Sequence, residues 1–458
     1  MGVKLLKRKI LSVIVTACLG MTLISGCGSA ASAGSDKSEG GKTEITFWHS
    51  MGGSGGEAIE EMVDKFNREN TENIHVTAQY QGEYDDAINK IKSSKDKSTY
   101  PDVMQLYDIG TRWMIDSKMS VPMQDLIDKN NYDTSSLEKN LLGYYTVDDK
   151  LYSMPFNSST PILYYNKDAF KEAGLDPEKA PQDLDEIAEY SQKLTKKDGD
   201  TVTQYGYSMA IYGWFFEQFL AKQLLPFANN GNGRDASATS VDFNKNGGGL
   251  KILTKWKDLY DKGLLGNFGR KTSDTQQAFI AGKTAMFIDS TASLKDVLKG
   301  VDGKFQVGTA YMPKVNKDDK GGVSIGGGSL WVLDKNDENK QKAAFEFIKF
   351  MVEPEQQVYW NEKTGYFPVT TKAYDLDEMK NHLAETPQFQ TAINQLHDSP
   401  LESRGALLGV FPEARQTNET NIEAVIQGKM SPEEAVAESE KSINSAIEKY
   451  NKANKNTK

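Results

Sequence analysis

Strand-like and helix-like apolar spacings alternate along the chain. Residues 44–48 and 74–80 read as strands, with an apolar stripe at helical spacing between them, and a further short strand is expected at 102–106. Such β-α-β alternation favours a parallel sheet with helices on both faces, in which ligands bind outside the carboxyl ends of the strands. The expected fold class is therefore α/β, with a working edge near His49 and Asp108.

Later segments continue the same pattern. Strands are expected at 162–165 and 329–333, and helices at 184–194, 250–260 and 344–351. A last helix is marked by a capping box, with Ser431 as its cap, Pro432 in the first turn and Glu434 three residues after the cap. No short-period repeat is present, which excludes solenoids and propellers.

The N-terminus has the layout of an export signal. Four positive side chains at positions 4–9 precede an uncharged apolar stretch at 10–24, which is shorter than the roughly 20 residues of a membrane-spanning helix. The following Leu23-Ile24-Ser25-Gly26-Cys27 resembles the bacterial lipobox. We expect a lipoprotein signal peptide at 1–26, lipidation of Cys27 and a flexible tether over 27–43. A plain signal peptide that contains a cysteine is the alternative.

Charge and cysteine content exclude several classes of protein. The 458 residues carry a net charge of −10, and removal of residues 1–26 takes away four positive charges and no negative one, giving −14. A chain this acidic does not suit nucleic-acid binding. Both cysteines, Cys18 and Cys27, lie in the export segment, so a disulfide scaffold or Cys-based zinc site is excluded. The four histidines have no metal-binding spacing, so neither a metal nor another cofactor is expected.

Motifs for catalysis are weak. The glycine-rich stretch 52–56 is either a permissive turn or an anion cradle, and it lacks the residues of a nucleotide-binding loop. No G-x-S-x-G elbow is present, and the sequence assigns no carboxylate pair to glycoside hydrolysis. An enzyme is therefore a remaining alternative without a positive signal.

Several expected loops mix glycine, aromatic and hydroxyl residues. These stretches are 48–52, 155–161, 325–331 and 363–368. Aromatic rings cover C–H faces while hydroxyls and backbone amides bind oxygens, so such loops suit a polyol or a sugar.

Taken in order, these stretches resemble the extracellular solute-binding proteins of ABC importers, in particular the glycerol-3-phosphate-binding branch of the maltose-binding-like family. The block at 155–170 is the most specific part of the resemblance. The family implies two α/β lobes with an interlobe ligand cleft and hinge crossovers. We expect lobe I to comprise 44–157 and 290–355, and lobe II to comprise 158–289 and 356–458.

The resemblance also implies a set of ligand contacts: Tyr84, Asp108, Ser159, Trp214, Ser290, Gly327, Tyr366 and Arg415. In the roles it suggests, Arg415 offers a planar cationic fork to a phosphate, and Asp108 with Ser159 receives the glycerol hydroxyls. The tyrosines, Ser290 and the Gly327 amide add neutral donors.

Two positions depart from the family's glycerol-3-phosphate binder. Asp108 stands in place of a Glu, and Ile211 in place of a second Trp, which opens space near Trp214. Trp214 could face a quaternary ammonium, so glycerophosphodiesters such as glycerophosphocholine are hypothesised as further ligands. The rivals are an oligosaccharide receptor and a secreted glycerophosphodiesterase or glycosidase. The expected partners are permease subunits and, through the lipid on Cys27, the membrane. Members of the family are usually monomers, so a monomer is expected.

Overall fold

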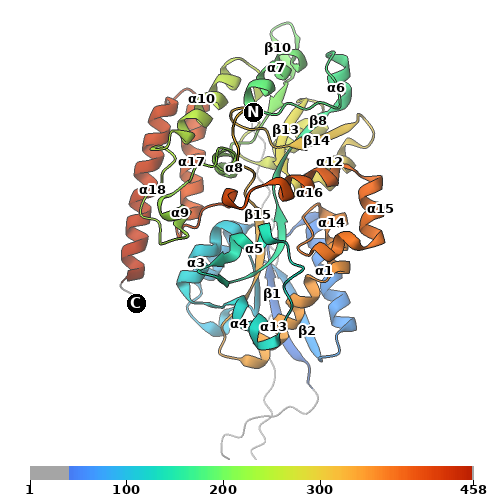
Figure 1. Ribbon diagram of the computed structural model, residues 1–458, viewed down its shortest axis with the longest axis vertical. Helices are drawn as coiled ribbons and strands as arrows, with labels where there is room; N and C mark the ends of the chain where they lie inside the picture. The colour runs from blue at the N-terminus through green and yellow to red at the C-terminus, as the bar shows by residue number, and fades with distance from the viewer. Residues whose placement is uncertain (1–40, 456–458) are drawn as a thin grey trace, which may run out of the picture. The chain divides into compact units, whose positions relative to one another are not determined.

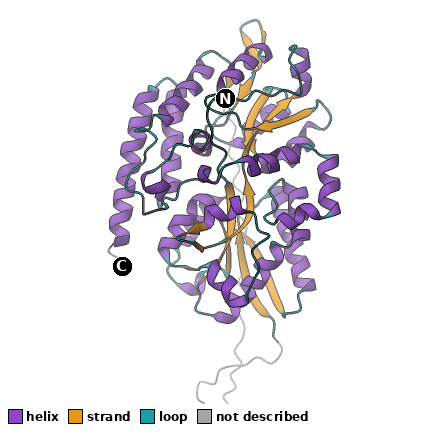
Figure 2. Cartoon of the chain, in the orientation of Figure 1, coloured by secondary structure: helices purple, strands orange, loops and turns teal. Residues whose placement is uncertain are grey.

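The computed structural model describes residues 41–455, so the expected signal peptide and Cys27 lie outside the described part. The described residues from Lys42 onward form one compact unit. It contains a six-stranded and a five-stranded sheet, each flanked by helices (Figures 1 and 2).

The first sheet has the strand order β2-β1-β3-β15-β4, with β7 also paired to β15. Its strands are β1 (Thr43–His49), β2 (Ile74–Tyr80), β3 (Val103–Tyr107), β4 (Ser120–Val121), β7 (Met154–Ser159) and β15 (Gly326–Leu333). β1 runs parallel to β2 and β3, as the β-α-β pattern predicts, whereas β15 is antiparallel to β3, β4 and β7. The sheet is thus mixed, because β15 comes from a distant segment of the chain and runs in the opposite direction.

Helices from both halves of the sequence surround this sheet. They are α1 (Gly53–Glu69), α2 (Tyr84–Ser93), α3 (Thr111–Ser117), α4 (Met123–Asn130), α5 (Lys139–Tyr145), α13 (Glu338–Met351) and α14 (Pro354–Thr364), with the 3₁₀ turns η1 (Lys97–Thr99) and η2 (Asp108–Gly110). Helix α13 contacts β1 and β15, and α14 contacts α1.

The second sheet has the order β12-β11-β13-β8-β14. Its strands are β8 (Pro161–Asn166), β11 (Tyr207–Ser208), β12 (Leu265–Gly266), β13 (Met286–Ser290) and β14 (Val307–Tyr311). The remaining helices are α6 (Lys167–Glu172), α7 (Leu184–Leu194), α8 (Gly213–Lys222), α9 (Asn229–Gly233), α10 (Gly248–Asp261), α11 (Thr272–Ile280), α12 (Leu294–Val301), α15 (Asp377–Glu385), α16 (Gln388–Asp398), α17 (Phe411–Ile426) and α18 (Pro432–Lys455). Further 3₁₀ turns and hairpin strands are η3 (Thr291–Ser293), η4 (Thr371–Asp375), η5 (Leu401–Ser403), β5 (Thr146–Val147) with β6 (Lys150–Leu151), and β9 (Lys196–Asp198) with β10 (Thr201–Gln204).

The chain passes between the two sheets at several points. Thr160 alone separates β7 in the first sheet from β8 in the second, and residues 312–325 lead from β14 back to β15. Strand β14 pairs with β8, although the expected boundary assigned 290–355 to lobe I. Helix α14 contacts α1, although 356–458 was expected in lobe II. The sequence marks no boundary here because both lobes alternate strands and helices in the same way.

Local sequence signals correspond well to the elements. The expected helix at 184–194 coincides with α7, where the Asp183 side chain accepts hydrogen bonds from two first-turn amides. The capping box of α18 is confirmed: the Glu434 amide donates to Ser431 Oγ at 3.2 Å, and the Ser431 amide donates to Glu434 Oε2 at 2.8 Å. None of the helices within residues 41–455 combines the length and the apolar character that a bilayer span requires.

Candidate functional site

Asp108 and His49 lie where the sequence places the working edge. Asp108 directly follows β3, and His49 is the last residue of the neighbouring parallel strand β1. Both side chains are buried. Burial lowers the pKa of His49 to about 4, so its imidazole is neutral at physiological pH. The carboxyl ends of the parallel strands thus bring one carboxylate and one neutral ring to the same edge.

A group of neutral hydrogen-bonding residues forms one part of the site. Asn157 Nδ2 donates to the Tyr84 hydroxyl at 2.7 Å, and Asn157 and Tyr84 are both hydrogen-bonding neighbours of the Tyr366 hydroxyl. The Tyr366 ring stacks on Trp360, with ring centroids 5.6 Å apart and planes within 7°. Burial raises the pKa of Tyr84 and of Tyr366, so both hydroxyls keep their protons and can donate.

Strand ends supply the rest of this group. Gly327 in β15 pairs with Ser158 in β7, and the next pair joins Gly326 to Ser159. Gly327 has φ 91°, and a Cβ there would lie 1.9 Å from the Asn157 carbonyl oxygen, so the close approach of the strands requires glycine.

Ser290, at the end of β13, caps η3 by accepting the Ala292 amide at 3.1 Å, which leaves its hydroxyl hydrogen available. We refer to Tyr84, Ser159, Ser290, Gly327 and Tyr366 as the donor cluster.

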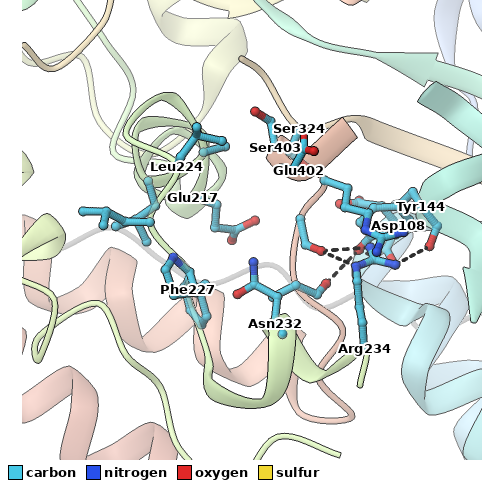
Figure 3. Close-up of a pocket in the computed structure, with 18 of the residues that line it drawn as sticks. Asp108, Tyr144, Glu217, Leu224, Phe227, Asn232, Arg234, Ser324, Glu402 and Ser403 are labelled. Atoms are coloured by element: carbon cyan, nitrogen blue, oxygen red, sulfur yellow. Dashed lines mark hydrogen bonds between the residues drawn. The ribbon is translucent and has the colours of Figure 1, made fainter. Parts of the chain in front are cut away.

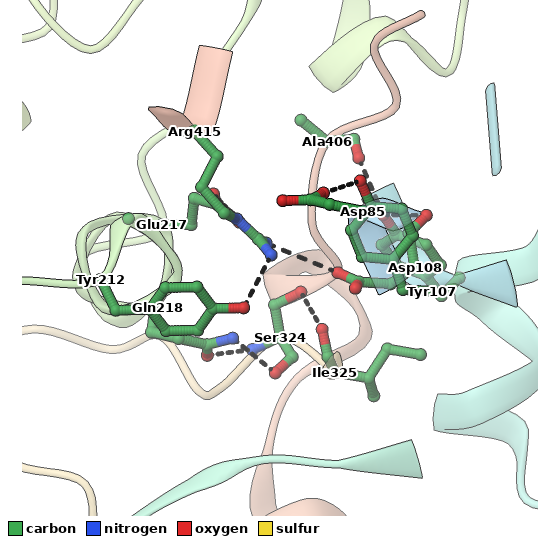
Figure 4. A network of polar contacts seen from close by, with 12 residues as sticks. Asp85, Tyr107, Asp108, Tyr212, Glu217, Gln218, Ser324, Ile325, Ala406 and Arg415 are labelled. Carbon is green, nitrogen blue, oxygen red and sulfur yellow. Dashed lines mark hydrogen bonds and ion pairs between the residues drawn. The ribbon is translucent and has the colours of Figure 1, made fainter. Parts of the chain in front are cut away.

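Arg415 on α17 forms a second group with residues of both lobes (Figure 4). Its Nε and Nη2 donate to the two carboxylate oxygens of Glu217, at 2.8 and 2.7 Å, and Nη1 donates to the Tyr212 hydroxyl at 3.3 Å. Nη2 also lies 3.8 Å from Asp108 Oδ2. Asp108 lies in η2, directly after β3 of the first sheet. The other three residues belong to α8, its N-cap and α17, so an ion pair joins the two lobes. We refer to Asp108, Tyr212, Glu217 and Arg415 as the arginine group.

The charges of this group are unbalanced. Burial raises the pKa of Asp108 to about 7, although Arg415 acts to lower it, and Glu217 reinforces the increase. Burial by itself lowers the pKa of Arg415, but Glu217 and Tyr212 outweigh this effect and raise that pKa well above its usual value. Arg415 is therefore always charged and already neutralised by Glu217, and it is not the free cationic fork that the sequence suggests.

Trp214, on α8, lies beside both groups. A Cβ on Gly326, the neighbour of Gly327, would lie 2.6 Å from Trp214 Cζ2, and the Trp214 and Tyr212 rings are 6.4 Å apart. Trp214 Nε1 is buried without a hydrogen-bond partner in the part of the chain that the structure describes. Ile211, where space was expected near the ligand, is 1% exposed and packed in a hydrophobic cluster that contains residues of both lobes.

Sequence reasoning missed Glu217, Tyr212 and Asn157 as site residues. Glu217 had a detectable signal, because a carboxylate interrupts the otherwise apolar segment 212–228, and a buried carboxylate needs a partner. Asn157 lies within the stretch 155–161, but nothing in the sequence distinguishes its side chain from its neighbours. Among residues 41–455, no group of three or more His, Cys, Asp or Glu side chains is placed to hold a metal ion.

The fold, with an ion-paired and hydroxyl-rich site between two α/β lobes, defines a solute-binding protein. A profile of bacterial extracellular solute-binding proteins matches residues 61–390, and the chain belongs to this family. The sn-glycerol-3-phosphate-binding periplasmic protein UgpB of Pectobacterium atrosepticum is 35% identical over 446 residues, covering 95% of this chain and 94% of that protein. UgpB of Escherichia coli K12 is 34% identical over 423 residues, covering 90% and 94%.

Solved structures show the same fold. UgpB from Mycobacterium tuberculosis in complex with glycerophosphocholine superposes with a TM-score of 0.75 at 22% identity, covering 90% of this chain and 100% of that one. The sugar-binding protein MalE from Xanthomonas citri gives 0.72 at 21% identity, covering 89% and 98%. The two-lobed architecture expected from the sequence is thereby confirmed.

Proposed function

We propose that this protein is the lipid-anchored, extracellular substrate-binding component of an ABC importer, and that it captures glycerol 3-phosphate or a glycerophosphodiester. The observation that carries the proposal is the neutral donor cluster beside an arginine that is already paired with carboxylates. The UgpB relatives, which are named for glycerol 3-phosphate, support the same ligand class.

The two groups suit the two ends of the ligand. A phosphate oxygen accepts hydrogen bonds, so the hydroxyls of Tyr84, Ser290 and Tyr366 can hold it as neutral donors. The neighbouring Asp289 carboxylate accepts hydrogen bonds from the Ser290 amide at 2.8 Å and the Ser293 hydroxyl at 3.0 Å. A glycerol hydroxyl both donates and accepts, so it can bridge the Asp108 carboxylate and the Arg415 guanidinium. We therefore assign the phosphate to the donor cluster and the hydroxyls to the arginine group, which reverses the role expected for Arg415.

The start of α1 supports this placement of the phosphate. Its N-cap, Gly52, makes no side-chain cap, so first-turn amides remain available to an anion. Met51 Sδ lies 3.9 Å from Asn157 Nδ2, which brings this helix end next to the donor cluster.

Ligand capture follows from contacts on both lobes. Tyr84 and Asp108 belong to the first lobe, and Ser290 and Arg415 to the second. A ligand that bonds to both sets favours the closed arrangement, which is the state we expect the permease to recognise.

Calorimetry with purified protein tests the proposed ligand. We expect saturable heat from glycerol 3-phosphate, and recovery of the ligand unchanged distinguishes a receptor from a phosphodiesterase or glycosidase. Binding of maltose without binding of glycerol 3-phosphate would overturn the proposal in favour of an oligosaccharide receptor. Heat from glycerol 3-phosphate but none from glycerophosphocholine would restrict the ligand to the monoester.

Membrane fractionation tests the proposed lipid anchor at Cys27. Cys27→Ala should release the protein from the membrane fraction while leaving ligand binding intact, because Cys27 precedes the described unit. A wild-type protein found only in the soluble fraction would remove the lipid anchor from the proposal.

A further inference from the structure

A cavity of about 300 Å³ continues beyond the arginine group (Figure 3). Asp108 and Glu217 contribute to its lining, whereas none of the donor cluster does. The space is on the order of ten water molecules in volume, since one water occupies about 30 Å³ in the liquid. Glycerol phosphate that spans the donor cluster and the arginine group leaves this space free.

The walls of the cavity differ in character. Part of the lining is apolar, with Leu220, Leu225, Phe227 and Phe411. Another part, which we call the polar wall, includes Asn232, Arg234, Glu402 and Ser403. Figure 3 shows the Glu217 carboxylate and the Asn232 amide pointing into the same space from different segments. A lining that combines apolar and hydrogen-bonding side chains suits a ring that has C–H faces and hydroxyl edges.

The polar wall is held rigidly. Arg234 donates through Nε and Nη2 to the Gly405 carbonyl at 3.0 and 2.8 Å, and through Nη1 to the Tyr144 carbonyl at 3.2 Å. Asn232 Oδ1 accepts the Ala228 amide at 3.0 Å, which leaves Nδ2 as a donor. These side chains are fixed before any ligand arrives, as binding sites require.

Segment α9, which contributes Gly231 and Asn232 to the cavity lining, has a backbone that departs from helical geometry. Asn230, Gly231 and Asn232 follow one another in the left-handed region, with φ of 53°, 60° and 62°, and Leu224 at the rim has φ 54°. Left-handed conformation in a Leu is rare, and such strain concentrates at ligand sites, where the surrounding structure enforces it.

The charged side chains in the lining determine whether a charged or a neutral ligand group suits the cavity. The lining contains four carboxyl groups and two guanidiniums, those of Arg234 and Arg404, and the Arg234 guanidinium is bound to backbone carbonyls. The cavity therefore has no excess of positive charge for a second phosphate. A neutral, hydroxyl-rich group is the best match.

From this geometry we propose that the cavity is a second subsite, which takes a neutral sugar or polyol of about one monosaccharide unit joined to the hydroxyl end of the glycerol moiety. The proposal rests on the function proposed above. It makes the preferred ligand a glycosylated glycerol phosphate rather than the bare monoester.

Calorimetry with glycerol 3-phosphate and with its 1-O-glucosyl derivative tests the subsite. The wild type should bind the glucosyl compound at least as tightly as glycerol 3-phosphate. Ala221→Phe, which places a ring into the cavity, should weaken the glucosyl compound about tenfold or more and leave glycerol 3-phosphate within about twofold. Ala437→Phe, on an exposed position of α18, is the matched control and should change neither affinity.

The remaining outcomes separate failure of the second subsite from failure of the proposed function. Glucosyl binding far weaker than that of glycerol 3-phosphate, or an equal loss for both ligands in Ala221→Phe with an unchanged melting temperature, overturns the subsite alone. If Ala221→Phe does not fold, the exposed Glu402→Ala replaces it and should weaken only the glucosyl compound. Failure of both phosphate compounds to bind the wild type overturns the proposed function and the subsite together.

Discussion

The guanidinium of Arg415 is bound to the Glu217 carboxylate through two parallel hydrogen bonds, Nε to Oε1 at 2.8 Å and Nη2 to Oε2 at 2.7 Å. Both side chains are largely buried, at 7% and 11% exposure. This pairing sets the chemistry of the site, because it removes the net positive charge from the residue that sequence reasoning assigned to phosphate. It also makes the arginine a rigid partner for groups that both donate and accept.

Removal of Arg415 should affect both stability and binding. Arg415→Ala leaves the Glu217 charge buried and unpaired, so the free energy of unfolding should fall by about 3 kcal/mol in urea titrations. Ligand affinity should fall about 100-fold or more. The double variant Glu217→Gln/Arg415→Met should recover most of the stability and none of the affinity.

Arg270→Ala provides the control for this prediction. Arg270 pairs with Glu423 at a partly exposed position, so its loss should cost no more than about 1 kcal/mol. Equal costs for Arg415→Ala and Arg270→Ala would contradict the energetic importance of the buried pair.

Asp108 should make stability and binding respond to pH in opposite directions. Burial raises the pKa of Asp108 to about 7, so between its unfolded value near 4 and about 7 the folded state holds a proton that the unfolded state has lost. The Asp108 contribution is therefore fully present below pH 4 and is lost as pH rises to 7, with a slope of at most about 1.4 kcal/mol per pH unit. Ligand affinity should instead rise with pH towards 8, since the ionised carboxylate accepts the hydroxyl.

Asp108→Asn isolates this effect from other buried acids. Burial also raises the pKa of Asp289 to about 6, with the same sign, so the difference between wild type and Asp108→Asn is the relevant quantity. Chemical denaturation and calorimetry between pH 5 and 8 measure it. Parallel pH profiles for the two proteins would show that Asp108 does not titrate in this range.

Gly327→Ala should disrupt the pairing of β15 with β7 at the donor cluster. Its Cβ would meet the Asn157 carbonyl oxygen at 1.9 Å, in addition to the strain of φ 91°. Gly303→Ala is a matched control, because Gly303 has φ 72° with nothing within 4 Å of a Cβ. Thermal unfolding should show a cost of about 1–2 kcal/mol for Gly303→Ala and at least twice that for Gly327→Ala. Equal losses of stability in Gly303→Ala and Gly327→Ala would mean that β7 and β15 move apart to admit the Cβ without an energetic cost.

The neutral donors should matter for affinity and little for stability. Tyr366→Phe and Ser290→Ala each remove a hydroxyl assigned to the phosphate, so affinity for glycerol 3-phosphate should fall about tenfold or more. Tyr311→Phe, whose hydroxyl bonds to the exposed Asp398, is the control and should leave affinity unchanged. If Tyr366→Phe weakens a neutral sugar as much as it weakens glycerol 3-phosphate, the phosphate does not lie on this cluster.

Part of the secondary structure of the described residues was readable from the sequence. The helix at 184–194 and the capping box at Ser431 were predicted to the residue, because side-chain caps and helical apolar spacing are local signals. The direction of β15 was not readable. Its pairing with β3 and β7 joins segments more than 160 residues apart along the chain, and no local pattern encodes such a register.

The site was predicted in part. Family resemblance supplied Asp108 and Arg415, and the structure brings them within ion-pair distance across the two lobes. Glu217 stood out only as an interruption in an apolar segment, and its role depends on the orientation of α8 against α17. Asn157 links the tyrosines through a contact of 2.7 Å that only the folded chain contains.

By itself, the sequence determined part of the secondary structure and the chemical types of side chain at the candidate site, since these depend on composition and short spacing. Only the tertiary structure decided which charges neutralise one another. The electrostatic character of a buried group depends on neighbours within a few ångströms and on lost solvent, and both arise from packing of distant segments. Arg415 therefore reads as a lone cation in the sequence and is half of an ion pair in the folded protein.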